Sequence, residues 1–171
     1  VQDAIKQLKG RNSKNRLFRF EQGVLASFAV DTLEVYMTTQ LKGQETYFLP
    51  FNMGKGEGIE AGSGNPHNPD GVDTEYLWLD VLTMDSILQL VESFIFYEVD
   101  KTNSKKKTLI FPRYHQRRAV SRLLEDMKTN HTDNNYLIQH SAGSAKTNTI
   151  AWLAHSLVSL HDDQNRNIVD T

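Results

Sequence analysis

The chain contains the apolar stretch Tyr136-Leu-Ile-Gln-His140, followed directly by Ser141-Ala-Gly-Ser-Ala-Lys-Thr147. The first part is short and predicts a β-strand, whereas the apolar pattern from Asn148 to Leu160 predicts a helix. A strand, a loop of small residues, Lys-Thr and a helix, in that order, are the context of a phosphate-binding P-loop. This stretch therefore predicts an α/β fold built around a nucleotide site.

The chemistry of such a loop depends on the backbone and on two side chains. Small residues let backbone N–H groups turn inward around a phosphate, and the helix amino terminus adds donors and a positive dipole end. Lys146 would reach the β- and γ-phosphates of ATP, and Thr147 would present its hydroxyl to the Mg²⁺ that the nucleotide carries. The predicted nucleotide-binding residues of the loop are Ala142, Gly143, Ser144, Ala145, Lys146 and Thr147.

The loop departs from the usual pattern G-x-x-x-x-G-K-[ST] at both glycine positions. His140 occupies the first and Ala145 the second, immediately before Lys146. If the backbone needs a positive φ at Ala145, its Cβ costs about 1–2 kcal/mol or blocks the approach of a phosphate. A connection between strand and helix without a function is the alternative.

Upstream of the loop the apolar spacing predicts two more helices. One runs from Tyr114 to Met127, and the other lies within Thr83–Phe96, with Asp85 or Ser86 as its N-cap. The polar, lysine-rich residues 98–108 have no period and predict an exposed linker, with a domain boundary near residue 100.

The amino-terminal half has strand patterns. Residues 23–30 and 33–39 predict a β-hairpin, and residues 45–49 predict a third short strand before Pro50. Ala4 to Lys9 predicts the end of a helix that Gly10 terminates. The glycine-rich residues 51–74 predict a long loop, and a loop of this length is usually functional or mobile.

The amino-acid composition excludes several classes of protein. The chain has 171 residues, a formal net charge of −2 and no cysteine, which excludes disulfides, zinc knuckles and thiol catalysis. No run approaches about 18 apolar residues, so we expect neither a transmembrane helix nor a membrane partner. No signal peptide is visible, and cytoplasm is the default compartment. The chain begins with Val1, which indicates a piece of a longer protein.

Charge is distributed in blocks. Residues 1–19 and 101–118 are basic, whereas residues 57–100 contain acidic residues and neither lysine nor arginine. Such blocks describe partners and not the fold. They are either solvated faces with a linker or a basic path beside nucleic acid or nucleotide. A pI near 6.3 disfavours a free-standing DNA-binding module.

Several ordered motifs resemble the restriction (R) subunit of type I restriction-modification enzymes. The motifs are Asp3-Ala-Ile-Lys-Gln-Leu-Lys9, Val30-Asp-Thr-Leu-Glu-Val-Tyr-Met-Thr-Thr39, Phe48-Leu-Pro-Phe-Asn52, Gly64-Asn-Pro66, Tyr76-Leu-Trp78, Phe111-Pro-Arg-Tyr-His-Gln116, the stretch 136–147 and Ile150-Ala-Trp-Leu-Ala-His155. The resemblance implies a mixed sheet from the rear of a RecB-like nuclease domain, followed by the start of a RecA-like P-loop motor domain. Residues 1–80 would belong to the nuclease domain, residues 81–110 would link the domains, and residues 111–171 would begin the first motor domain.

The resemblance also implies a function and partners. R subunits are type I site-specific deoxyribonucleases that translocate and cleave double-stranded DNA with ATP, together with methylase and specificity subunits. By resemblance, Gln116 would read adenine and Gln7 would support the nuclease site, although the aromatic residue expected soon after Gln7 is missing.

The catalytic residues of both domains would lie outside the 171 residues. The resemblance places the nuclease metal ligands before Val1 and the acidic ATPase motif after Thr171. We therefore expect no catalytic residue, and neither ATPase nor nuclease activity, in this chain alone. A truncated motor sheet would expose edges that allow self-association.

Two alternatives remain open. One is a different P-loop nucleotide-binding protein, such as a small kinase or GTPase, which the position of Gln116 disfavours. The other is a non-catalytic interaction module with a decayed P-loop, which Ala145 favours.

Overall fold

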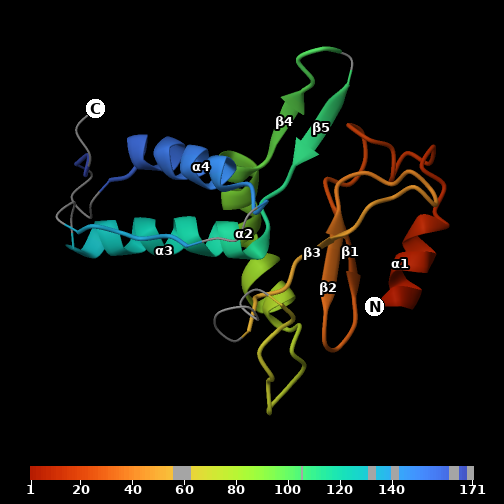
Figure 1. The fold of residues 1–171 in the computed structure, drawn as a ribbon, viewed down its shortest axis with the longest axis horizontal. Helices are drawn as coiled ribbons and strands as arrows, with labels where there is room; N and C mark the ends of the chain where they lie inside the picture. Colours follow the sequence, from red (N-terminus) through yellow and green to blue (C-terminus); the bar gives the residue numbers. More distant parts are fainter. Residues whose placement is uncertain (56–62, 105, 131–133, 140–142, 162–165, 169–171) are drawn as a thin grey trace. The chain divides into compact units, whose positions relative to one another are not determined.

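Helices and two small antiparallel sheets make up the fold (Figure 1). The computed structural model describes all residues except 56–62, 105, 131–133, 140–142, 162–165 and 169–171. The chain divides into two units, residues 1–114 and 115–171. The expectation of mixed helices and strands is met, whereas the RecB-like and RecA-like domain types stay predictions.

The first sheet contains the predicted hairpin. Strands β1 (Ser27–Val30) and β2 (Val35–Thr38) pair antiparallel, with Ser27 opposite Thr38 and Val30 opposite Val35. The third strand, β3, is Leu49–Pro50 and not the predicted 45–49. Residues 43–46 form a turn instead, because the Thr46 hydroxyl donates to the Gly43 carbonyl at 2.7 Å.

Aromatic rings fill the core of the first unit. Phe51 is 1% exposed and makes edge-to-face contacts with Phe28, Phe111 and Tyr114, at centroid distances of 5.3, 6.1 and 6.2 Å. Tyr76 packs on Tyr114 in the same way and donates its hydroxyl to the Phe51 carbonyl at 2.8 Å. Burial raises the pKa of Tyr76 well above its ordinary value. The core therefore joins the β-hairpin to segments far along the chain.

Helix α1 (Gln2–Lys9) precedes the sheet and contacts β1 (Figure 1). It stops at Gly10, as predicted, and Gly10 keeps a right-handed conformation with φ −79°. None of its residues is fully buried.

The predicted helix within Thr83–Phe96 is present with a different start. A wide turn, η2 (Leu77–Val81), leads into α2 (Met84–Gln89) and a second wide turn, η3 (Leu90–Phe94). The N-cap is Thr83, whose hydroxyl accepts from the Ser86 backbone, and not Asp85 or Ser86. Part of the predicted apolar stripe is solvent-exposed, because only Leu90 and Phe94 of η3 reach the core.

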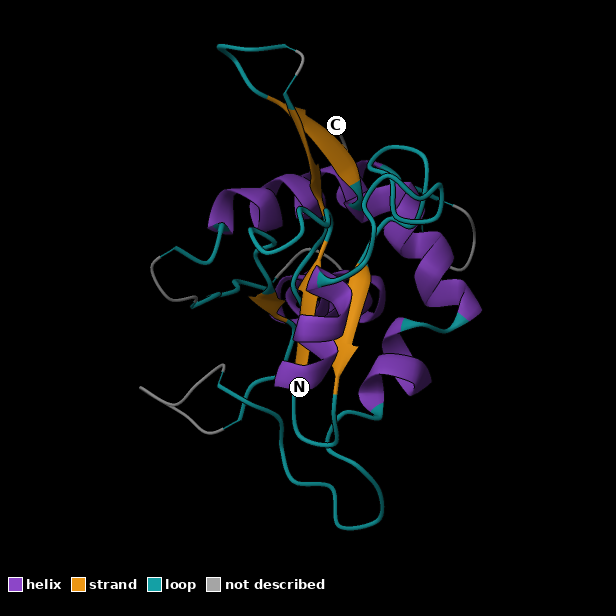
Figure 2. Ribbon diagram, turned by 90° about the vertical axis from the view of Figure 1, so that its right-hand side faces the viewer, coloured by secondary structure: helices purple, strands orange, loops and turns teal. Residues whose placement is uncertain are grey.

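The segment predicted as a linker is a β-hairpin. Strands β4 (Phe96–Val99) and β5 (Lys107–Ile110) pair antiparallel, with Val99 opposite Lys107. All four residues of β4 are exposed. The hairpin extends away from the β1–β2–β3 sheet in both views (Figures 1 and 2). The prediction of exposure is confirmed for β4, and the prediction of an irregular linker is wrong. Backbone pairing joins the two strands although their sequences do not alternate between apolar and polar residues.

The second unit contains two helices. The first, α3 (Tyr114–Asn130), begins where predicted, at the last residue of the first unit, and ends three residues later than predicted. The second, α4 (Lys146–Val158), begins two residues earlier than predicted. The predicted strand is wrong where the structure describes it, because Tyr136–Gln139 has no strand partner and Leu137 is 94% exposed. A strand needs a neighbour for its backbone groups, and the described part of this unit supplies none. His140 lies outside the described residues.

Candidate functional site

The candidate nucleotide site is the start of α4. Lys146 and Thr147 are its first two residues, both with exposed side chains. The first N–H groups of an α-helix have no carbonyl partner within the helix, so this end favours an anion. The sequence predicted Lys146 and Thr147 at the start of a helix, and the structure has them there. Ala142, another predicted residue of the site, lies outside the described residues.

Two of the described residues in the loop before α4 are left-handed. Gly143 has φ 74°, and Ala145, the N-cap, has φ 52° and ψ 48°. Glycine adopts such a backbone at no steric cost, whereas alanine pays about 1–2 kcal/mol because of its Cβ. The position before Lys146 therefore has the conformation that makes the Gly-to-Ala departure costly.

Gln116 holds this loop in place. It lies in the first turn of α3, is 2% exposed, and donates its side-chain Nε2 to the carbonyls of Ser144 at 2.9 Å and Ala145 at 3.2 Å. The amino-terminal ends of α3 and α4 consequently lie together (Figure 1). The structure thus places Gln116 against the loop, where the NH2 group of its amide donates to two backbone carbonyls. Its role in reading adenine stays a prediction.

Two buried hydroxyls beside the loop have no hydrogen-bond partner in the described part of the chain. They are Ser144 Oγ and Thr149 Oγ1, each on a side chain that is 4% exposed. A buried hydroxyl without a partner costs about 1–3 kcal/mol, so such an atom points to a missing polar group. Together with the positive end of α4 and Lys146, this donor set fits a phosphate with its Mg²⁺.

The part of the chain that the structure describes holds no group of three or more metal-binding side chains. Thr147 was predicted to bind the Mg²⁺ that a nucleotide carries, and this role stays a prediction. Gln7, the predicted nuclease-associated residue, is exposed on α1, and no catalytic residue was predicted. No helix among the described residues is long and apolar enough to cross a membrane.

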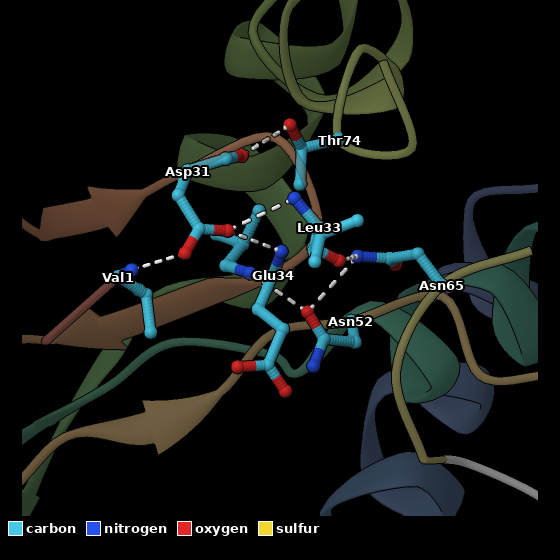
Figure 3. Close-up of polar contacts among 8 residues, drawn as sticks. Val1, Asp31, Leu33, Glu34, Asn52, Asn65 and Thr74 are labelled. Carbon is cyan, nitrogen blue, oxygen red and sulfur yellow. Dashed lines mark hydrogen bonds and ion pairs between the residues drawn. The ribbon is translucent and has the colours of Figure 1, made fainter. Parts of the chain in front are cut away.

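A polar network at the β1–β2 turn was missed by the sequence patterns (Figure 3). Asn52 Oδ1 accepts from the Val35 N–H at 2.8 Å and from Asn65 Nδ2 at 3.1 Å. Asn65 Nδ2 also donates to the Leu33 carbonyl at 2.8 Å, and Asn65 Oδ1 accepts from the Met53 N–H at 2.7 Å. These contacts join three of the motifs that carry the resemblance, 30–39, 48–52 and 64–66.

Asp31 completes this network from the turn itself. Its carboxylate accepts from the backbone N–H groups of Leu33 and Glu34. The Thr74 hydroxyl donates to the Asp31 carbonyl at 2.7 Å. The network has a structural role, because its polar groups bind one another.

Comparison with known proteins adds one relative. Over 84 residues the chain is 33% identical to a protein of Methanocaldococcus jannaschii named as a candidate type I restriction enzyme MjaVIIIP endonuclease subunit. The match covers 47% of this chain and 8% of the length of that protein. No family model and no solved structure matches the chain. The similarity thus supports a role in a restriction enzyme.

Proposed function

We propose that the chain is part of the R subunit of a type I restriction-modification enzyme and spans the junction of its nuclease and motor domains. The observation that carries this proposal is the 33% identity over 84 residues to a protein named as an endonuclease subunit of that class. The order of the motifs along nearly the whole chain supports the same assignment. The proposed boundaries are residues 1–80, 81–110 and 111–171.

In this proposal, the start of α4 binds ATP with Mg²⁺. Lys146 would contact the phosphates, Thr147 would hold Mg²⁺ through the nucleotide, and Gly143, Ser144 and Ala145 would surround the phosphates. The buried, unpartnered Ser144 hydroxyl and the exposed Lys146 at a helix amino terminus support this placement. Hydrolysis of ATP supplies the free energy that moves double-stranded DNA through the complex.

The whole protein would translocate and cleave double-stranded DNA in complex with methylase and specificity subunits. The 171 residues alone should hydrolyse no ATP and cut no DNA, because phosphoryl transfer needs parts that the resemblance places outside this stretch. ATP turnover or DNA cutting by the pure 171-residue chain would contradict this expectation.

Lys146→Ala in the full-length protein tests the nucleotide site. Loss of a charge-assisted contact to phosphate should weaken binding of a fluorescent ATP analogue roughly 10- to 100-fold. The matched control is Lys128→Ala, which removes an exposed lysine from the last turn of α3 and should leave the affinity unchanged. Equal ATP affinity in the Lys146→Ala variant and the wild type would overturn the site.

The second candidate function is a non-catalytic interaction module with a decayed loop. The observation that favours it is the Gln116 amide, which is buried and bonded to loop carbonyls. Gln116→Ala separates the two functions. If Gln116 reads adenine, the wild type prefers ATP over GTP and the Gln116→Ala variant loses this preference. If the chain is an interaction module, neither the wild type nor the variant binds a nucleotide. A wild-type preference for GTP would instead favour a different P-loop protein.

A further inference from the structure

Two basic segments that lie far apart in the sequence meet on one face of the first unit. The loop between α1 and β1 carries Phe20 and Glu21, and the β4–β5 hairpin carries Tyr97 and Lys107. The rings of Phe20 and Tyr97 meet edge to face, with centroids 5.9 Å apart. Lys107 Nζ donates to Glu21 Oε1 at 2.9 Å and lies 5.9 Å from the centre of the Tyr97 ring. The two segments are therefore bound to each other.

We call the exposed basic side chains of these segments the basic face. Its residues are Arg11, Lys14, Arg16, Arg19, Lys101, Lys106 and Lys107. Two of them pair with acids: Lys107 with Glu21, and Lys106 with Asp100 at 3.7 Å. Arg11, Arg16 and Lys101 have no ion pair within the described part of the chain. The face consequently carries an excess of positive charge, although the whole chain is slightly acidic.

The hairpin presents this charge on an ordered backbone. The Asp100 N–H donates to the Lys106 carbonyl at 2.9 Å, and the Lys106 N–H donates to the Asn103 carbonyl at 2.8 Å. The Asp100 carboxylate accepts from the Thr102 N–H and hydroxyl at 2.8 and 2.6 Å. Because these bonds constrain the backbone at residues 100, 102, 103 and 106, less backbone entropy is lost when Lys101 and Lys106 bind a partner. All four residues of β4 are exposed, so the hairpin is accessible to a large partner.

We propose that the basic face is a contact surface for the sugar–phosphate backbone of duplex DNA. The proposal rests on the proposed function, which makes double-stranded DNA the substrate, and it adds a surface that lies outside the nucleotide loop. Phosphates are the partner because the exposed groups are cations on long side chains, which neutralise backbone charge without reading bases. The binding is independent of DNA sequence, since another subunit would read the recognition site.

The test uses the full-length protein and a fluorescent duplex without a recognition site. The variant combines Arg11→Gln, Arg16→Gln and Lys101→Gln, which breaks no ion pair in the described part of the chain. The matched control combines Lys42→Gln, Arg122→Gln and Lys128→Gln, three exposed residues outside the basic face. Anisotropy titrations at several salt concentrations give the affinity and its salt dependence.

We expect the basic-face variant to bind DNA roughly 10-fold or more weakly at about 100 mM salt, with the slope of log K against log salt reduced by about 1–3, since each phosphate contact contributes about 0.9. The control should change neither quantity by as much. Equal losses in variant and control would overturn the proposal. So would a variant that binds DNA normally but no longer assembles with the methylase subunit, because the face would then bind protein.

ATP titrations of the same variants separate this inference from the proposed function. The basic-face variant should bind the ATP analogue as the wild type does, and Lys146→Ala should bind the duplex normally without ATP. If Lys146→Ala leaves ATP affinity unchanged while the basic-face variant loses DNA, the nucleotide site fails and the DNA surface stands. If Lys146→Ala loses ATP affinity while the basic-face variant binds DNA as the wild type does, the DNA surface is rejected and the nucleotide site stands.

Discussion

The β1–β2 turn and the loop before α4 differ in the number of hydrogen bonds that they receive from residues far away along the chain. At the turn, Asn52, Asn65 and Thr74 bind backbone groups from 17 to 43 residues away. At the loop, Gln116 supplies the long-range hydrogen bonds, two buried hydroxyls lack a partner in the described part of the chain, and Ala145 is left-handed. The comparison teaches that the first region is shaped by its own contacts. The second leaves two buried hydroxyls without a partner among the described residues, which the proposed nucleotide site would explain.

The largest effect should come from the core beneath the turn. Phe51→Ala removes a ring that contacts three other aromatic rings, so it should lower the free energy of unfolding by about 3–5 kcal/mol. Leu137→Ala, in the weakly supported region, should change it by less than about 0.5 kcal/mol, because Leu137 is 94% exposed. Urea denaturation measures both, and similar losses in the two variants would break the comparison.

The polar network should give the next largest effect. Asn65→Ala leaves the Met53 N–H and the Leu33 carbonyl without their partner, which should cost about 1–3 kcal/mol of unfolding free energy. The control is Asn12→Ala, because Asn12 also accepts a backbone N–H, from Lys14 at 2.9 Å, but is exposed. An equal, small loss in both variants, seen by urea denaturation, would show that the network adds little stability.

The strained loop should respond less and in opposite directions at its two left-handed residues. Ala145→Gly relieves the Cβ at φ 52° and should stabilise the protein by up to about 1 kcal/mol. Gly143→Ala should cost about 1 kcal/mol from the backbone alone, since nothing lies within 4 Å of the added Cβ. Thermal unfolding measures both changes, and we expect Ala145→Gly also to tighten ATP binding. The same sign of change in both variants would be inconsistent with this backbone.

The smallest effect should be a change with pH at the exposed end of α3. Tyr136 donates its hydroxyl to Asp126 Oδ2 at 2.5 Å, and this bond is the largest cause that lowers the pKa of Asp126 and raises that of Tyr136. Because the folded pKa of Asp126 is depressed, its contribution to stability is present above pH about 4 and disappears as pH falls through the lower folded value. NMR titration of Asp126 should give a midpoint below 3.8. In Asp126→Asn the pKa of Tyr136 should return toward 10.0, and an unchanged Tyr136 midpoint would exclude the bond.

Local patterns were sufficient for several elements. Apolar spacing correctly located α1, α3, α4 and the β1–β2 hairpin, because their periodicity needs only near neighbours along the chain. The same rules failed for Tyr136–Gln139, where the apolar run is present but the described residues form no partner strand. They also failed for residues 98–108, where a hairpin forms without alternation.

For the candidate site, the residue types could be predicted and their contacts could not. Lys146 and Thr147 at a helix start follow from the Lys-Thr motif and the apolar run behind it. The left-handed Ala145 and the hydrogen bonds from Gln116 depend on residues 28 and 29 positions apart, a distance that periodicity does not cover.

The sequence by itself determined which stretches form α1, α3 and α4, which segments are charged and which loop contains the residues proposed to bind phosphate. These properties depend on side-chain chemistry and on spacing within a few turns. Only the tertiary structure decided that the loop after α1 meets the β4–β5 hairpin, that Gln116 holds the loop before α4, and that three distant motifs share one polar network. The reason is physical: such contacts form when the chain folds back on itself, and the loop closure that brings them together leaves no periodic signal in the sequence.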